Sequence, residues 1–406
     1  QGNWVEGLTT YLANYYYEEA TGTPAQAREQ RRMMVLGYAV YVSPEDDYPV
    51  GRFRTKSDQR DNAIGYQKAA MIFHMLRRQL GDAAFWAGIR TLAAEQGGAY
   101  VAWSEVARIF SGAAGADLGW FFAQWIDRAG APRFKLAEMS LKTLDVADAA
   151  GRPEGSLYRV AVRIVQEGQV YRARLPISLE LTGGQVQTQT LEMTAADQTF
   201  TLSVPARPVA LKVDPDFEAF RRLPREHLPP MLNLYVTDQE RTVVVPTAGS
   251  EAERAPYAEL ATRLATHQDQ RTAGARARPA QVADGEFSGA DGSVLILGGP
   301  GVNRAADWSV RGCGGRVSLG RNRFTVEGHT YDSPDGALLI SCRHPNRPGR
   351  VVTLFYGLTP SAAAKVARLL FFYGWQSYLV FRDGAVVARG DFVAPEEVPE
   401  ARFDAP

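Results

Sequence analysis

The chain has 406 residues, of which 45 are Lys or Arg and 45 are Asp or Glu, so its formal net charge at pH 7 is zero. A chain of this length exceeds a single ordinary hydrophobic core, and we therefore expect two or three domains. The balanced charge argues against a nucleic-acid-binding surface, and the longest apolar stretches are far shorter than the ~20 residues that span a bilayer.

The first part of the chain, residues 1–132, is predicted to be helical. In the opening stretch GNWVEGLTTYLANYY, apolar side chains recur at the spacing of a buried helix face, and Glu6 lies in the first turn. A later amphipathic helix, IGYQKAAMIFHMLRRQLG, is predicted to stop at Gly81. Ser104 and Asp117 are predicted to cap two further helices.

The hydrophobic period changes from helical to alternating at Phe134, and residues 133–215 are predicted to form an antiparallel β-sandwich. In LYRVAVRIVQEG the apolar side chains occupy every second position up to a turn at Gly168, and the alternation resumes with Leu175 and Ile177. About six or seven short strands in one segment are typical of a sandwich.

Residues 216–406 begin with a polar, proline-bearing bridge, after which strands such as TVVVPT and SVLILGG alternate with helices such as EAERAPYAELATRLATH. This order predicts an α/β domain with a mixed sheet, whose role the sequence does not reveal. Cys313 and Cys342 lie on neighbouring predicted strands, where a disulfide and two buried thiols remain equal alternatives. The whole chain is therefore predicted to be a multidomain α+β protein.

Four segments of the helical part occur in the order and spacing of a known family. Trp4-Val5-Glu6-Gly7 resembles the helix that carries the glutamate ligand in the M1 family of zinc aminopeptidases, which are gluzincin-type metallopeptidases. Gly65-Tyr66-Gln67-Lys68-Ala69 resembles the family segment whose tyrosine faces the scissile carbonyl. FHMLRRQLGDAAFWAGIR and WFFAQWIDRAGAPRF are similar to the helices that follow and to the closing element. The resemblance covers residues 1–134, and the predicted sandwich agrees with the family's usual third domain.

The resemblance implies a zinc site in which Glu6 is one of three protein ligands, the other two being histidines of an H-E-x-x-H helix. It also implies that Tyr66 donates a hydrogen bond to the oxyanion of the tetrahedral intermediate. None of the five histidines in the sequence lies in an H-E-x-x-H motif. The resemblance therefore implies the C-terminal portion of a larger zinc aminopeptidase, with residues 1–132 forming the helical part of its catalytic domain. Without the upstream histidines and general-base glutamate, we expect this fragment to hold no zinc and to be inactive.

These residues also have simpler interpretations. A glutamate in a first helical turn is stabilised by the helix dipole alone, and a lone tyrosine is usually a core or surface residue. Lys68 is expected to pack or pair rather than to contact substrate, and His74, on an apolar helix face, is expected to be structural. The M61-like glycyl aminopeptidases share the Glu-Gly helix, although the Gln-Trp…Gly-x-Pro ending fits the M1 family better. The competing function is a non-catalytic protein-interaction module built on a degenerate peptidase scaffold.

The expected partners follow from the same interpretation. The parent protein would act on peptides, and this chain would pack against the missing N-terminal part of the same protein. Loss of the preceding helix is expected to expose apolar side chains around Leu8, Leu12 and Tyr15, which would favour self-association through the N-terminal helix. We expect no nucleic acid and no membrane span, and we favour an exported or periplasmic location over a cytoplasmic one.

Overall fold

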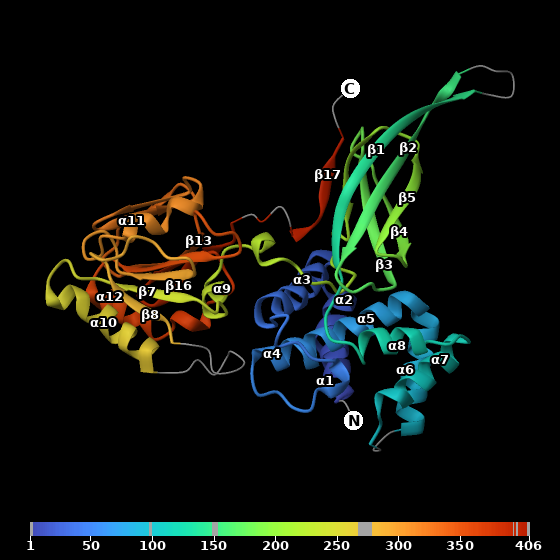
Figure 1. Cartoon of the computed structure of the whole chain (residues 1–406), viewed down its shortest axis with the longest axis horizontal. Coiled ribbons are helices and arrows are strands. Elements are labelled where there is room, and N and C mark those ends of the chain that lie inside the picture. Colours follow the sequence, from blue (N-terminus) through green and yellow to red (C-terminus); the bar gives the residue numbers. More distant parts are fainter. Residues whose placement is uncertain are drawn as a thin grey trace. The chain divides into compact units, whose positions relative to one another are not determined.

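The computed structural model describes residues 3–96, 100–147, 153–266, 278–392, 394 and 397–403, with only the backbone for 145–147, 153–156 and 266. The chain forms two compact units, one of residues 1–223 with 396–406 and the other of residues 224–395. The predicted multidomain α+β class is confirmed (Figure 1). The division into three domains at 132 and 215 stays a prediction. Within the described ranges, no helix has the length and apolar character needed to cross a membrane.

The first unit begins with a layer of helices. These are α1 (Trp4–Thr9), η1 (Thr10–Tyr16), α2 (Tyr17–Thr21), α3 (Pro24–Tyr41), η2 (Val50–Arg52), α4 (Gln59–Asn62), η3 (Ala63–Lys68), α5 (Ala69–Leu80), α6 (Asp82–Gln96), α7 (Trp103–Ala114) and α8 (Gly119–Trp125). Both η1 and η3 are π-helical turns that join the α-helices on either side without a break. Gly81 ends α5 with φ of 78°, which confirms the predicted stop, because glycine adopts this backbone conformation without strain.

Two predicted helix caps are wrong. Helix α7 begins at Trp103, with Ala102 at the N-cap position, so Ser104 already lies inside the helix. The Trp103 ring stacks on Phe73 at 5.6 Å between centroids, and this packing, rather than a local cap, fixes where the helix starts. Asp117 lies one position before the N-cap of α8, although its carboxylate still accepts a 2.8 Å hydrogen bond from the backbone N–H of Gly119.

Two antiparallel sheets follow the helices. Their strands are β1 (Arg133–Ala147), β2 (Pro153–Glu167), β3 (Ala173–Leu181), β4 (Val186–Met193), β5 (Asp197–Val204), β6 (Pro208–Val213) and β17 (Glu400–Arg402). One sheet has the order β1-β2-β5 and the other β17-β6-β3-β4, and β1 and β2 form a long hairpin (Figure 1). The predicted alternation is confirmed, since Val160 and Ile164 of β2 are buried in one core with Leu175 and Ile177 of β3.

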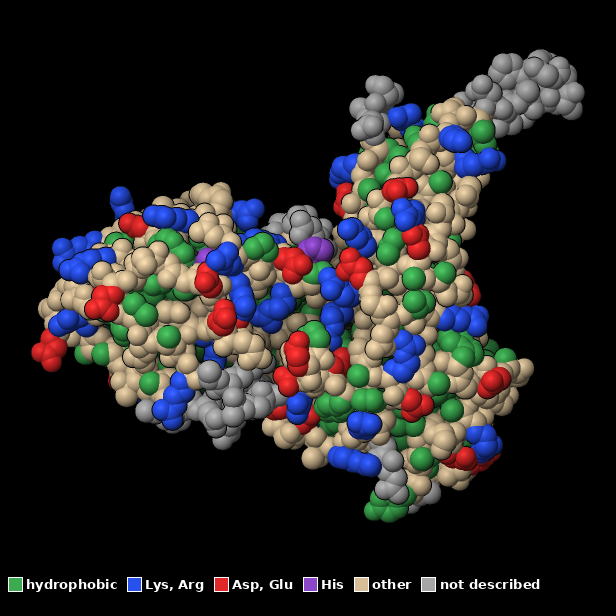
Figure 2. Space-filling model, in the orientation of Figure 1, with side chains coloured by type: hydrophobic (Ala, Val, Ile, Leu, Met, Phe, Trp, Pro, Cys, Tyr) green, Lys and Arg blue, Asp and Glu red, His purple; other side chains and the backbone are tan. Residues whose placement is uncertain are grey.

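The last strand of the second sheet comes from the far end of the chain. Strand β17 pairs antiparallel with β6, placing Ala401 opposite Leu211. Arg32 on α3 forms a bidentate ion pair with Glu397, at 2.8 and 2.7 Å, just before this strand. On the face of the sandwich drawn in Figure 2, Lys and Arg side chains lie among Asp and Glu side chains, in keeping with the net charge of zero.

The second unit is an α/β layer structure. Its helices are η4 (Arg225–His227), α9 (Leu232–Val236), α10 (Glu251–Thr266), α11 (Ala306–Ser309), η5 (Arg311–Cys313), α12 (Pro360–Ala367) and η6 (Leu370–Phe372). Its strands are β7 (Arg241–Val245), β8 (Ala280–Ala283), β9 (Ser293–Leu297), β10 (Val317–Gly320), β11 (Arg323–Val326), β12 (His329–Tyr331), β13 (Gly336–Arg343), β14 (Val351–Gly357), β15 (Tyr378–Arg382) and β16 (Ala385–Gly390). The predicted mixed sheet is confirmed, with the order β16-β15-β13-β14-β9-β7-β8 and parallel pairing from β14 to β8.

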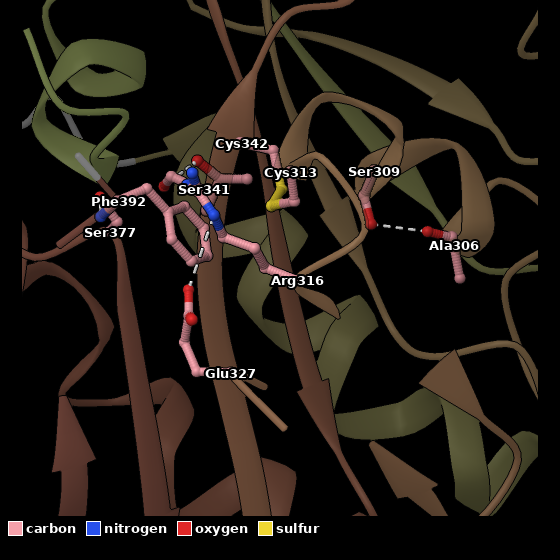
Figure 3. Close-up of a disulfide and its surroundings, with 10 residues drawn as sticks. Ala306, Ser309, Cys313, Arg316, Glu327, Ser341, Cys342, Ser377 and Phe392 are labelled. Atoms are coloured by element: carbon pink, nitrogen blue, oxygen red, sulfur yellow. Dashed lines mark hydrogen bonds and ion pairs between the residues drawn. A yellow bond between two sulfur atoms is a disulfide. The ribbon is translucent and has the colours of Figure 1, made fainter. Parts of the chain in front are cut away.

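A disulfide links η5 to the central strand β13 of this sheet. Figure 3 shows the sulfur atoms of Cys313 and Cys342 joined, which decides between the two alternatives that the sequence left open. Both cysteines are buried in the core under β10–β12. Nearby, the Arg316 guanidinium lies 5.3 Å from the centroid of the Phe392 ring and 3.9 Å from Glu327.

Reduction of this disulfide is expected to destabilise the second unit. The two cysteines are 29 positions apart. Closing a loop of this length restricts the unfolded chain and contributes about 3–4 kcal/mol on the chain-entropy model. Urea unfolding with and without dithiothreitol measures the effect. A Cys313→Ala/Cys342→Ala double variant serves as the control and should not respond to the reductant. An unchanged unfolding midpoint in the wild type, after release of two thiols has been verified, would contradict this expectation.

Candidate functional site

The structure brings Glu6 and Tyr66 together, although they come from different parts of the helical layer. Glu6 lies in the first turn of α1, and Tyr66 lies in the π-helical turn η3 that precedes α5. The Glu6 carboxylate lies close enough to the Tyr66 hydroxyl for the two groups to interact. Partial burial, and then the negative charge and hydrogen bond of Glu6, raise the pKa of Tyr66 above its ordinary value. Tyr66 therefore stays protonated at neutral pH and remains a hydrogen-bond donor.

Two glycines allow this close approach of segments. A Cβ atom at Gly7 would lie 2.4 Å from the Cβ of Ala69, the first residue of α5. A Cβ atom at Gly65 would lie 2.4 Å from the ring of Phe53. Since Cβ atoms essentially never approach other atoms within 3.0 Å, both positions require glycine. The Glu-Gly and Gly-Tyr pairs in the sequence thus each place a candidate site residue beside a glycine that permits tight packing.

Two neighbours of Tyr66 were not indicated by the sequence. Phe53 meets the Tyr66 ring edge-on, with 5.7 Å between the centroids, and fixes its orientation. The ammonium group of the exposed Lys56 lies 5.8 Å from the centroid of the same ring, at cation–π distance. Both residues belong to a polar, turn-rich stretch without hydrophobic periodicity, so no local pattern marks them.

The start of α1 is held by contacts to distant loops. The indole N–H of Trp4 donates a 2.8 Å hydrogen bond to the carbonyl of Val101, and the backbone N–H of Asn3 donates to Phe53 at 3.1 Å. The expected exposure of Tyr15 is wrong, because this side chain is 1% exposed. The π-helical turn η1 directs Tyr11 and Tyr15 inward, and Tyr15 packs edge-on against His74.

Leu8 and Leu12, the other two side chains expected to be exposed, are half-buried. Val5, next to Glu6, and Tyr17 are exposed in this region. Self-association through the N-terminal helix stays a prediction.

A buried polar network surrounds Lys68, two residues after Tyr66 in the same turn. Lys68 is fully buried, and its ammonium group donates a 2.8 Å hydrogen bond to the carbonyl of Gly130. Burial lowers the pKa of Lys68 to about 8, although the nearby charge of Asp47 opposes this shift. The Asp47 carboxylate in turn accepts hydrogen bonds from the N–H of Gly130 at 2.9 Å and from Arg222 at 3.0 Å. The expectation that Lys68 packs and pairs is confirmed.

A second buried network surrounds His74 on α5. Its Nε2 lies 3.0 Å from the Glu218 carboxylate, which also accepts two hydrogen bonds from Arg78 and lies 3.3 Å from Arg31. Burial lowers the pKa of His74, against the opposing effect of Glu218. Burial acts to raise the pKa of Glu218, but the hydrogen bonds from His74 and Arg78 outweigh it and lower that pKa. His74 is therefore a structural residue, as expected.

The residues present do not by themselves fit a zinc ion. Among the described residues, no group of three His, Cys, Asp or Glu side chains is arranged to hold a metal ion. A catalytic zinc site takes three protein ligands and keeps one position for water. Glu6 offers one carboxylate, and its partner here is a phenol. We therefore assign no catalytic step to a metal held by this chain alone.

Comparisons with known proteins give limited information. No protein-family model matches the sequence, and no curated protein is similar to it. Among solved structures, the chain is similar to the crystal structure of Legionella pneumophila aminopeptidase A in complex with aspartic acid, with a TM-score of 0.38 and 17% identity. The match covers 66% of this chain and 29% of that one, so this chain spans under a third of its length. Similarity at this level does not assign the chain to a family.

Replacement of Gly7 by alanine tests the close packing at the site. Gly7→Ala forces α1 away from Ala69, and overpacking of this kind typically costs about 1–3 kcal/mol in the free energy of unfolding. Gly112→Ala is the matched control, because an added Cβ at this position in α7 meets nothing within 4 Å. That variant should gain about 0.5–1 kcal/mol through helix propensity. Chemical denaturation of both variants measures the difference, and equal effects would refute the packing argument.

Acid is expected to destabilise the first unit through His74 and Glu218. Both folded-state pKa values lie below their ordinary values of 6.5 and 4.5, so the unfolded state binds protons first as the pH falls. Stability is therefore fully present above pH 6.5 and is lost as the pH drops below it. The melting temperature at about pH 7.5 and about pH 5 measures this loss. His74→Gln, which keeps a donor for Glu218 but does not titrate, should show a shallower decline; an identical decline would exclude His74 as its source.

Proposed function

We propose that this chain carries part of the active site of a zinc aminopeptidase of the M1 type, an enzyme that removes N-terminal residues from peptides. The observation that carries the proposal is the proximity of Glu6 and Tyr66, whose side chains interact although they come from different helices. The sequence resemblance gives these two residues the roles of metal ligand and oxyanion donor, and those roles require them to face one reaction centre. Two residues chosen for unrelated structural reasons would have no cause to meet in this way.

Tyr66 is suited to stabilise a developing negative charge. Its raised pKa keeps the proton on the phenol, and the edge-on contact with Phe53 holds the ring in place. Such a preorganised donor contributes most when the oxygen becomes an anion, and losing one typically costs ~3–4 kcal/mol of transition-state stabilisation.

Glu6 would contribute one carboxylate to the metal site, which when complete supplies Lewis acidity to the peptide carbonyl. The proposal needs two further ligands and a general base that the sequence does not contain. We propose that they are the histidines and glutamate of an H-E-x-x-H helix encoded before Gln1, at the spacing found in the family. Sequencing the gene in that direction is the most direct observation available.

Substitution of Tyr66 in the longer gene product separates the two roles. Tyr66→Phe removes only the hydroxyl, so zinc content should be unchanged while kcat falls roughly 10²–10³-fold with a modest change in KM. Glu6→Ala should lose the metal as well as the activity. Tyr17→Phe is the matched control, because Tyr17 is 63% exposed, and its activity should equal that of the wild type.

Two results would overturn the proposal. A folded, zinc-loaded Tyr66→Phe protein with near-normal kcat would assign Tyr66 to structure. A gene product that contains no H-E-x-x-H motif and binds no zinc would favour the non-catalytic interaction module instead.

A further inference from the structure

The first unit contains a cavity of about 450 Å³ that the proposed reaction does not use. Its walls are the C-terminal part of α5, helix α8, the outer face of strands β3 and β4, and the segment that follows β6. Neither Glu6 nor Tyr66 lines it. Tyr66 precedes the first turn of α5 whereas Arg78 lies in the last, which separates the two places by roughly 15–18 Å along the helix axis. The cavity is therefore a second site.

The floor of the cavity is aromatic. Trp125 and Phe220 are buried, with 6.4 Å between their ring centroids, and Trp120 is half-buried beside the opening. The volume lies within the ~300–1,000 Å³ that is typical of small-ligand sites, which combine apolar walls with a few polar groups. The floor therefore offers flat apolar surface to a ligand that can also satisfy the polar groups above it.

Those polar groups are two arginines on one face of the sandwich. Arg172 and Arg174 are two positions apart at the start of β3, so their side chains leave the strand on the same side. The Arg172 guanidinium lies over the Trp120 ring, 4.4 Å from its centroid, and Arg174 donates a 2.8 Å hydrogen bond to the carbonyl of Arg78. These contacts hold both side chains in place before any ligand binds.

Most of the donors on these two guanidinium groups remain available. Both guanidinium groups form ion pairs with Glu192 on β4, at 3.5 Å from Arg172 and 4.0 Å from Arg174. Within the described part of the chain, neither guanidinium donates a hydrogen bond to a side chain. An arginine fork of this kind is the group best matched to a carboxylate, which it binds through two parallel hydrogen bonds.

The two acidic side chains that line the cavity do not neutralise the positive charge of its two arginines. Glu218 is already engaged by His74 and by Nε and Nη2 of Arg78. Asp216, on the rim, is exposed, and its ion-pair partner is Arg28 at 3.8 Å. Glu192 pairs with both Arg172 and Arg174, so the groups left to a ligand are the remaining N–H donors of these two arginines above an aromatic floor.

We propose that this cavity binds an organic carboxylate that carries a flat apolar group, as the C-terminal residue of a peptide does. The carboxylate lies between Arg172 and Arg174, and the apolar group packs on Trp120 and Trp125. The hydroxyls of Thr188 and Thr190 on the edge strand β4 line the same cavity and offer hydrogen bonds to a peptide backbone. The proposal is independent of the reaction at Tyr66.

The test measures the binding of three probes to the 406-residue chain. Calorimetry and tryptophan fluorescence report the binding. The first probe, N-acetyl-phenylalanine, carries both the carboxylate and the aromatic ring. The second is its C-terminal amide, which keeps the ring but lacks the negative charge. The third is a pentapeptide with an acetylated N-terminus and a C-terminal phenylalanine, which adds a peptide backbone to the same acid. None has the free amine that an aminopeptidase requires, so failure of the proposed reaction leaves this result unaffected. We expect saturable binding of the acid and at least about 10-fold weaker binding of the amide, because charge-assisted hydrogen bonds are roughly twice as strong as neutral ones.

Three variants assign the binding to the cavity. Arg172→Gln and Trp120→Leu should each weaken binding of the acid about 10-fold while leaving the melting temperature near that of the wild type. Arg163→Gln is the matched control, because Arg163 is a half-buried arginine on the sandwich, outside the cavity, that forms ion pairs with Asp197 and Glu138. It should bind the acid as the wild type does.

The outcomes are distinct. Tighter binding of the pentapeptide than of the acetylated amino acid would identify peptide C-termini as the ligand, and equal binding would identify small free acids; both support the carboxylate site. Equal affinity for acid and amide, no saturable binding, or the same loss in Arg163→Gln as in Arg172→Gln would overturn it.

Discussion

The helical layer and the sandwich of the first unit depend on one buried carboxylate, that of Asp47. It receives the N–H of Gly130, which precedes β1, and the guanidinium of Arg222, which follows β6. Lys68, from the end of η3, binds the carbonyl of the same Gly130. A buried charge is costly unless all its partners are present, so these segments must assemble together or not at all. Lys68 follows Tyr66 by two residues in the same π-helical turn, so this network anchors the backbone segment that carries the candidate site.

The sequence predicted the parts of the fold that arise from local periodicity. The alternation around Val160 and Ile164 placed the sandwich correctly, and the glycine at position 81 marked the end of α5. The pairing of β17 with β6 could not be predicted. A strand of three residues is too short for its alternation to stand out in the sequence, and its partner strand lies far away in the chain. The start of α7 was missed for a similar reason, since a ring contact of Trp103 with a distant helix outweighs local capping.

The candidate site likewise combines residues that the sequence indicated with residues that only the tertiary structure reveals. Glu6 and Tyr66 were found through a resemblance in motif order, and the structure shows that they meet. Lys56 approaches the same ring from a stretch in which nothing distinguishes it from its polar neighbours. The arginine-lined cavity did have a sequence signal, a pair of arginines at alternate positions of a strand. Its meaning depended on the tryptophan that α8 places beneath them, which only tertiary structure supplies.

The return of the chain end to the first unit makes the second unit an insertion within the first. During synthesis, the ribosome must complete the whole inserted unit before β17 emerges and can pair with β6. Until then the outer edge of β6 offers unpaired backbone groups, and unpaired strand edges are common starting points for aggregation. Rapid independent folding of the inserted unit therefore benefits the nascent chain. A folded insertion brings the chain ends after β6 and before β17 closer together, so that less entropy is lost when the two strands pair. Translation rate and chaperone supply should accordingly influence yield more for this protein than for one whose domains follow one another in sequence.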